Sequence, residues 1–192
     1  MTRLILASAS PQRKTLLEGL GLKFKAVPSS VDEAACPEPD PVIRARVLAE
    51  MKAKDVWDKN KSAWVIGCDT LVVSPDGTLF EKPENADEAR HMIKTQSGRM
   101  STVHSGLSLL SPDGRHAEGV SSSDVTFKRL TEREIDWWVE KGKWEGRSGS
   151  FQIDGLGQFL ISEIRGDWTS IVGFPVFLFG QLLEELKAPF VF

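Results

Sequence analysis

Apolar residues follow two different periods along this chain. Short apolar runs predict buried strands, whereas apolar positions that recur every three or four residues predict helices. The predicted strands cover residues 4–7, 23–28, 62–73, 100–110, 117–130 and 159–165, with a short one ending at residue 80, and the predicted helices cover residues 11–20, 86–94, 131–141 and 175–186, with another beginning at residue 41. Helices and strands alternate at first, and a meander of strands follows. This order predicts an α/β fold with a mixed, twisted sheet and flanking helices. No linker-like segment interrupts it, so we expect a single domain over residues 1–192.

Local signals place several of these boundaries. Asp40 before a proline is typical of a helix start, and Thr131 with Glu134 forms a capping box. Two Ser-Pro-Asp-Gly tetrapeptides, at residues 74–77 and 111–114, predict tight turns and therefore two hairpins. The helix that begins at residue 41 has an apolar repeat at Ile43, Val47 and Met51.

The composition narrows the possible functions. The chain has 192 residues, 41% of them hydrophobic, and a formal net charge of −3 without a block of like charges. It therefore lacks the basic patch that a nucleic-acid partner needs. No apolar run approaches the ~20 residues of a membrane span and no signal peptide is recognisable, so we expect a cytoplasmic protein without a membrane partner. Cys36 and Cys68 lack a metal-type spacing, and we expect two free thiols in a reducing compartment.

The segment 4–17 predicts an anion-binding site. Its strand is followed by two hydroxyls, Ser8 and Ser10, and Ser10 is suited to cap a helix that begins at Pro11. Arg13 falls in the first turn of that helix. Backbone N–H groups, the helix dipole and the guanidinium would then all face a phosphate. In isolation, the alternative for this segment is an ordinary capped strand-to-helix turn.

Carboxylates at two places are candidates for catalysis or metal binding. Asp69 lies inside an apolar strand, where a carboxylate needs a partner, and Gly67 beside it would let a ligand approach the backbone. Asp32 and Glu33 form an acidic pair in a loop. Together these residues could supply oxygen ligands for Mg²⁺. The alternatives are a strand-end aspartate that faces solvent or caps a turn, and a solvated acidic loop.

Cationic side chains give a weaker signal. Lys52 and Lys54 lie beyond Arg44 and Arg46 on the second helix, and Lys82 lies in an extended segment before a proline. The alternative for each lysine is an ordinary surface position. The sequence contains neither a P-loop nor a dinucleotide-binding glycine pattern.

Taken in order, several segments resemble the Maf family of nucleoside triphosphate pyrophosphatases. They are LILASASPQRKTLL, SSVDE, LAEMKA, VIGCDT, FEKP, SGR at residues 97–99, DVTF at residues 124–127, GSFQIDG and GDWTSIVGFP. The resemblance covers nearly the whole chain. It implies two lobes around a deep nucleotide-binding cleft, and hydrolysis of a nucleoside triphosphate to the monophosphate and pyrophosphate. It also implies a divalent cation (Mg²⁺ or Mn²⁺) and a homodimer.

The resemblance assigns roles to particular residues. It implies that Glu33 and Asp69 are catalytic and hold the metal, with Asp69 as proton acceptor. From the residues alone, either carboxylate could be the base. The phosphate-binding residues implied by the family are Ser8, Ser10, Arg13, Lys52 and Lys82.

At the three positions that the family uses to contact the base, this chain has Gln12, Thr70 and Asp154, and Gln12 matches neither of two branches of the family. Thr70 matches a branch that acts on dTTP and UTP, whereas Asp154 is closer to a branch that acts on 7-methyl-GTP. An ionised Asp154 only accepts hydrogen bonds, which suits the two donors of a guanine edge. We therefore expect a guanine-type substrate such as 7-methyl-GTP. A dTTP/UTP pyrophosphatase and a nucleotide-binding regulator of cell division without turnover are the alternatives, and Asp154 could instead cap the glycine-rich loop.

Overall fold

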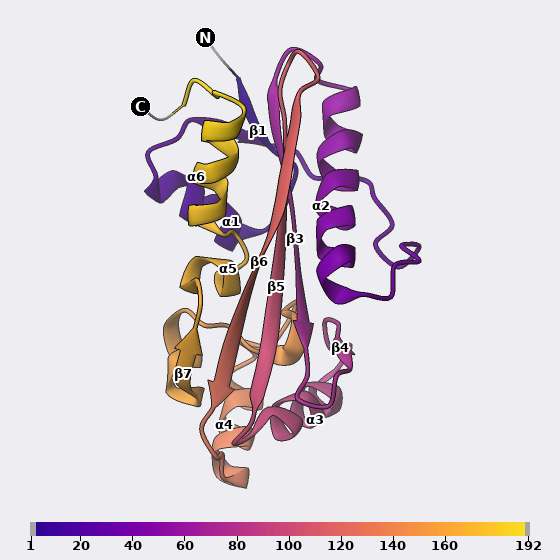
Figure 1. The fold of residues 1–192 in the computed structure, drawn as a ribbon. Helices are drawn as coiled ribbons and strands as arrows, with labels where there is room; N and C mark the ends of the chain where they lie inside the picture. The colour runs from indigo at the N-terminus through magenta and orange to yellow at the C-terminus, as the bar shows by residue number, and fades with distance from the viewer. Residues whose placement is uncertain (1–2, 191–192) are drawn as a thin grey trace. The chain divides into compact units, whose positions relative to one another are not determined.

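A computed structural model of the chain describes residues 3–190 (Figure 1). It confirms an α/β fold with a mixed sheet of seven strands flanked by helices, in the order β2-β1-β3-β5-β6-β7, with β4 paired to β3. The chain divides into two compact units. The first unit comprises the residues up to Asp69 together with Ser105–Ser121 and the residues from Gly173 onward, and the second comprises Thr70–His104 and Ser122–Val172.

The first unit is a three-layer arrangement. Strand β1 pairs in parallel with β2 and β3, and its alternate residues face opposite sides of the sheet. Leu4 and Leu6 contact α1 and α6 on one side, whereas Ile5 lies with the apolar residues of α2 on the other (Figure 1). The elements that contribute to this unit are β1 (Leu4–Leu6), α1 (Pro11–Gly19), β2 (Phe24–Ala26), α2 (Pro41–Asp58), the first part of β3 (Trp64–Val73), the end of β5 (Met100–Leu110), the start of β6 (His116–Phe127) and α6 (Val176–Glu185).

Helix α2 packs unusually close to the sheet. A Cβ added at Gly67 of β3 would lie 2.0 Å from the Ala49 carbonyl oxygen, and one added at Gly106 of β5 would lie 2.2 Å from the Ala45 carbonyl oxygen. The face of α2 that meets the sheet therefore carries small residues, with Ala53 one turn further on. The larger residues Ile43 and Met51 are exposed instead, and Val47 is half-buried. The repeat of Ile43, Val47 and Met51 therefore predicts the helix correctly, but it does not identify the face that is buried. That face carries alanines, because larger side chains would not fit where the helix approaches the sheet so closely.

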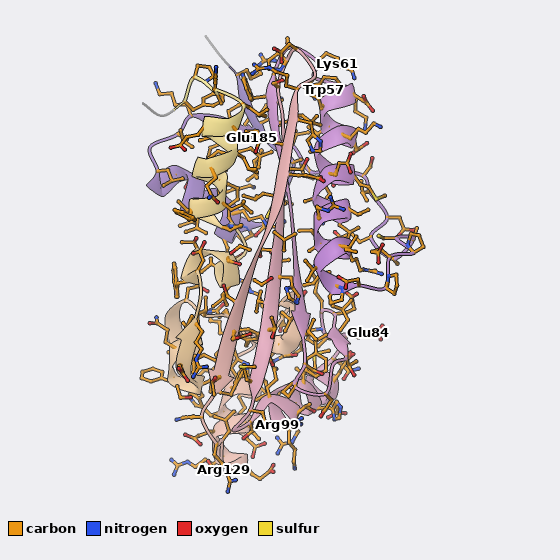
Figure 2. The ribbon with its side chains drawn as sticks, in the orientation of Figure 1. Trp57, Lys61, Glu84, Arg99, Arg129 and Glu185 are labelled. Carbon is orange, nitrogen blue, oxygen red and sulfur yellow. The ribbon has the colours of Figure 1, made fainter. Side chains whose placement is uncertain are left out.

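Both ends of α2 are fixed by side chains. The Asp40 carboxylate accepts hydrogen bonds from the first backbone N–H groups of the helix, which confirms the predicted cap. Near the other end, Trp57 Nε1 donates to the Ser111 carbonyl oxygen at 3.0 Å. Lys61 Nζ lies 3.3 Å from the centroid of the Trp57 ring (Figure 2). The helix that supplies Lys52 is therefore held along its whole length.

The second unit has a hydrophobic core of its own. Trp138, Phe127 and Ile93 are fully buried at its centre. Its remaining elements are β4 (Leu79–Phe80), α3 (Ala86–Gln96), α4 (Glu132–Glu140), the 3₁₀ helices η1 (Ser148–Ser150) and η2 (Gly155–Leu160), β7 (Ile161–Arg165) and α5 (Trp168–Val172). Strand β7 pairs antiparallel with β6. No helix within residues 3–190 has the length and apolarity needed to cross a membrane.

The predicted turns and capping box are confirmed. In both tetrapeptides the glycine N–H donates to the serine carbonyl oxygen, and Gly77 and Gly114 have φ of 82° and 84°. Thr131 and Glu134 make both reciprocal bonds of the capping box. Some predicted elements differ from the structure. The last strand begins at Ile161 because the residues before it form η2, and α5 was not predicted because five residues are too few to show a helical period.

Candidate active site

Ser8 and Arg13 organise the loop between β1 and α1. Arg13 Nη1 donates to the Ser8 hydroxyl oxygen at 3.1 Å, and the Ser10 backbone N–H donates to the same oxygen at 3.2 Å. Arg13 Nε donates to the Gly173 carbonyl oxygen at 2.9 Å, which fastens the loop to the segment before α6. The buried Ser8 hydroxyl is the acceptor in both of these hydrogen bonds, so neither of them involves its own O–H proton. A hydroxyl donor beside a guanidinium is suited to bind a phosphate oxygen.

Ser10 does not cap α1, although the sequence predicts that it would. The helix begins at Pro11 as expected, but the Ser10 side chain makes no cap hydrogen bond. Its hydroxyl instead donates to Gln12 Oε1 at 3.3 Å. The physical reason is local: the glutamine two residues on offers a side-chain acceptor that competes with the cap geometry. The N–H groups at the start of α1 thus lack a side-chain cap from Ser10 and could bind an anion.

Lys52 of α2 joins two carboxylates of the first unit. Its Nζ lies 2.5 Å from Asp69 Oδ1 and 2.7 Å from Glu33 Oε1. The side chains of Lys52 and Asp69 are only 7% and 4% exposed, whereas that of Glu33 is 49% exposed. Lys52 is therefore not a surface lysine, and Asp69 does not face solvent. The structure excludes both of these alternatives.

The strand and the helix explain how this cluster forms. Gly67 and Asp69 lie on the same face of β3, since side chains alternate along a strand. Gly67 admits α2 against that face, so Lys52 reaches Asp69. The close approach that the sequence predicts at Gly67 is thus with α2 and not with a ligand. On the opposite face, Cys68 Sγ donates to the Gly173 carbonyl oxygen at 3.0 Å, the same oxygen that accepts from Arg13.

One oxygen of Asp69 is left without a partner. Among the described residues, Asp69 Oδ2 is buried and accepts no hydrogen bond. Leaving a buried polar atom unpaired costs roughly 1–3 kcal/mol, and more for a charged group. A ligand that brings a donor or a positive charge would remove this cost. The atom is therefore suited to contact a water molecule or a metal ion.

The acidic residues fit a divalent cation as a partial ligand set. Mg²⁺ is usually bound by one or two carboxylates together with substrate phosphates. Glu33 and the unpartnered oxygen of Asp69 are carboxylate groups of this kind. Asp32 does not join them, because it is exposed and accepts from the Ala34 N–H at 3.1 Å. Within residues 3–190, no group of three or more His, Cys, Asp or Glu side chains is arranged to hold a metal. A cation here would take its remaining ligands from water or from a bound phosphate.

Three predicted site residues belong to the second unit. Thr70 follows Asp69 in β3 and is half-buried, and Lys82 is exposed after β4. Asp154 directly precedes η2 and is half-buried, and its side chain makes no cap bond there. The alternative in which it caps the glycine-rich loop through its carboxylate is therefore wrong. That these three residues share a site with the Lys52 cluster stays a prediction.

Sequence reasoning missed the part that Arg44 plays in the first unit. The guanidinium donates to the carbonyl oxygens of Glu33 and Cys36, at 3.1 Å and 2.9 Å. No spacing signal could identify this contact, because the acceptors are backbone carbonyls that every residue offers. Both thiols were expected to lie outside a disulfide, and neither Cys36 nor Cys68, which are both buried, forms one.

Comparison with known proteins identifies the family. The family described as Maf-like protein matches residues 3–186. A dTTP/UTP pyrophosphatase of Syntrophus aciditrophicus is 39% identical over 186 residues, which are 96% of this chain and 89% of the relative. A dTTP/UTP pyrophosphatase of Deinococcus radiodurans is 40% identical over 182 residues, 95% of this chain and 92% of the relative. A crystal structure of a nucleoside-triphosphatase / dITP/XTP pyrophosphatase from Mycobacterium abscessus covers 96% of this chain and 97% of its own, at 13% identity and a TM-score of 0.46, which is too remote to support an argument. The family match and the two relatives show that this chain belongs to the Maf-like protein family.

Proposed function

We propose that this chain hydrolyses a nucleoside triphosphate to the monophosphate and pyrophosphate. The proposal rests on one observation above all: the buried Lys52–Asp69 pair, with Glu33 on the same ammonium and one Asp69 oxygen unpartnered. Two relatives named dTTP/UTP pyrophosphatases support the same reaction. Phosphoryl transfer needs a carboxylate that can accept a proton and positive groups near the reacting phosphate. Asp69 Oδ2 and the Lys52 ammonium beside it supply both kinds of group.

In this proposal the β1–α1 loop binds the phosphates. The Arg13 guanidinium, which holds the Ser8 hydroxyl through Nη1, places a positive charge beside the phosphate oxygens, and the Ser8 O–H proton would be donated to one of them. Ser10 contributes through the backbone at the start of α1. The Lys52 ammonium already contacts the Asp69 and Glu33 carboxylates. The phosphate-binding roles of Lys52 and Lys82 therefore rest on the family resemblance alone.

Asp69 and Glu33 would carry the proton transfer. Attack on the α-phosphorus needs a water molecule that loses a proton, and a carboxylate within hydrogen-bond reach can take it. Asp69 Oδ1 is held by Lys52, so Oδ2 is the oxygen left to accept that proton. Glu33 is the second candidate for this role, with Asp69 then acting as a ligand.

Glu33 and Asp69 would also hold a divalent cation, with substrate oxygens completing its ligands. When bound, such a cation neutralises the charge that develops on the leaving pyrophosphate. Lys52 would keep the two carboxylates close together, since both contact its ammonium.

The proposed substrates are dTTP and UTP. The names of the relatives favour them, and the guanine preference inferred from Asp154 finds no support among those relatives. Asp154 is chemically compatible with either base. An ionised carboxylate accepts from the N3–H of uracil or thymine as well as from the edge of guanine. Gln12 and Thr70 could complete the contacts to the base.

Product analysis tests the proposal directly. Purified protein is incubated with UTP, dTTP, CTP, GTP and 7-methyl-GTP, with and without Mg²⁺, and pyrophosphate and monophosphate are quantified. We expect one pyrophosphate per monophosphate, Mg²⁺-dependent turnover, and the highest kcat/KM for UTP or dTTP. Release of orthophosphate would contradict the reaction, and a preference for 7-methyl-GTP would restore the guanine alternative. Tight binding without turnover would instead indicate a nucleotide-binding regulator. Light scattering on the same sample tests the predicted homodimer.

A further inference from the structure

The turn that carries Glu33 is tied to α2 at two points. Lys52 contacts the Glu33 carboxylate at 2.7 Å, and Arg44 donates to the backbone of the same turn, at the carbonyls of Glu33 and Cys36. The Cys36 N–H closes the turn by donating to the Glu33 carbonyl oxygen at 3.3 Å. One carbonyl oxygen of Glu33 thus receives both the turn hydrogen bond and the arginine.

We infer that Arg44 is a positioning residue that holds Glu33 against Lys52 and Asp69. This inference rests on the proposed function for its catalytic consequence, but the structural step stands separately. Both hydrogen bonds that the Arg44 guanidinium makes within residues 3–190 go to this turn, and its Nε is buried without a partner. The side chain is therefore committed to the turn and does not balance a carboxylate.

Glu33 needs such a constraint because its own side chain is half-exposed. Lys52 is buried, but the Glu33 carboxylate is open to water, which screens its attraction to the ammonium. The ion pair therefore holds the turn less firmly than a pair that is buried at both ends. Two hydrogen bonds from a planar guanidinium to backbone carbonyls fix the turn irrespective of whether the carboxylate is bound to Lys52. Arg44 thus sets the position from which Glu33 can reach a cation or a water.

Cys36 provides a direct readout of this turn. Its side chain is 3% exposed, and the other cysteine of the chain, Cys68, is 0% exposed and lies in β3. We compare the rate of modification of each thiol by a maleimide, resolved by mass spectrometry, in the wild type, Arg44→Met and Arg46→Met. Arg46 is the matched control, because it lies on the same helix and pairs with Glu118 instead.

We expect Arg44→Met to raise the modification rate of Cys36 at least tenfold, with Cys68 unchanged and Arg46→Met close to the wild type. An unchanged rate at Cys36 would overturn the inference. A parallel increase at both cysteines would overturn it as well, because it would show general opening of the fold.

Turnover tests the consequence for the site. If Arg44 acts through Glu33, Arg44→Met should lower kcat and raise the Mg²⁺ concentration that gives the half-maximal rate. Arg44→Lys should give values between those of Arg44→Met and the wild type. In a Glu33→Gln background the same substitution should cause no further loss. Equal losses in both backgrounds would overturn the positioning role. If no variant, including the wild type, releases pyrophosphate, the proposed function fails, while the thiol rates still decide whether Arg44 fastens the turn.

Discussion

At the scale of single residues, the most informative side chain is Asp69. Its sequence context, a carboxylate inside an apolar strand, already predicts a partner. The structure supplies Lys52 for one oxygen and leaves the other buried and unpaired. A residue needed only for stability would be expected to satisfy both oxygens, since an unpaired one is costly. This difference is why we assign Asp69 to chemistry and not to the core alone.

Replacing Asp69 by asparagine tests that assignment. The amide keeps an oxygen for Lys52 but cannot take a proton from water, so we expect kcat to fall by roughly 10²-fold or more with the fold retained. Steady-state pyrophosphate release gives kcat, and circular dichroism with thermal melting verifies the fold. Asp58→Asn is a matched control, because Asp58 makes an exposed pair with Lys61. Near-wild-type turnover in Asp69→Asn would assign the base role elsewhere.

At the scale of elements, the site depends on the distance between α2 and the sheet. Gly67 and Gly106 permit that distance, and alanines on α2 match them. Neither signal was recognised from the sequence as packing, because glycine in a strand also suits a bulge or a ligand contact. Most of the longer elements were predictable from capping residues, turns and periodicity, whereas short elements such as α5 and η2 were not. The contacts between elements were not predictable, because pairs such as Lys52 and Asp69 are brought together only by tertiary packing.

Gly67→Ala should separate α2 from β3. The added Cβ would meet backbone atoms, at 2.0 Å from the Ala49 carbonyl oxygen and 2.6 Å from the Ala53 nitrogen, so the helix has to move. We expect a loss of about 1–3 kcal/mol in the free energy of unfolding, measured by urea denaturation, and a fall in kcat as Lys52 shifts from Asp69. Gly19→Ala is the control, since a Cβ there has nothing within 4 Å. If both variants unfold at the same urea concentration as the wild type, the close contact does not position the site.

The capping box of α4 makes a prediction about pH. The Glu134 carboxylate accepts a hydrogen bond from Lys128 and further ones from Thr131, which lower its pKa from 4.5 to about 2. A carboxylate whose pKa falls on folding stabilises the folded state above its unfolded pKa, and that contribution is lost as the pH drops toward the folded value. We therefore expect Tm to fall between about pH 4.5 and pH 2, and to fall less in Glu134→Gln. Glutamine retains the capping pattern, so a steeper acid loss in this variant would contradict the assignment.

At the scale of the whole molecule, the structure confirms the α/β fold that the sequence predicts. It assigns the predicted site residues to two different compact units. Ser8, Ser10, Gln12, Arg13, Glu33, Lys52 and Asp69 all belong to the first unit, and Thr70, Lys82 and Asp154 belong to the second. Order along the chain predicted the mixed sheet, because alternating elements and hairpins constrain strand pairing. It could not predict the buried Lys52, which meets Asp69 only through tertiary packing, or the turn held by Arg44, whose acceptors are backbone carbonyls that carry no sequence signal.

Substrate choice gives a prediction for the second unit. We propose that Asp154 contacts the base, and that the chemistry is carried by Glu33 and Asp69, which belong to the first unit. Asp154→Gln should then change the ratio of kcat/KM between UTP and GTP, and leave the Mg²⁺ dependence intact. The expected change is ~1–3 kcal/mol, or roughly 5- to 150-fold in that ratio, the range for leaving a buried polar group unpaired.

Glu163→Gln is the matched control, because Glu163 is an exposed acid of the same unit that pairs with Arg165. Equal losses on every nucleotide would assign Asp154 to the stability of its loop. A changed ratio with an unchanged metal requirement would show that base selection and catalysis depend on different residues.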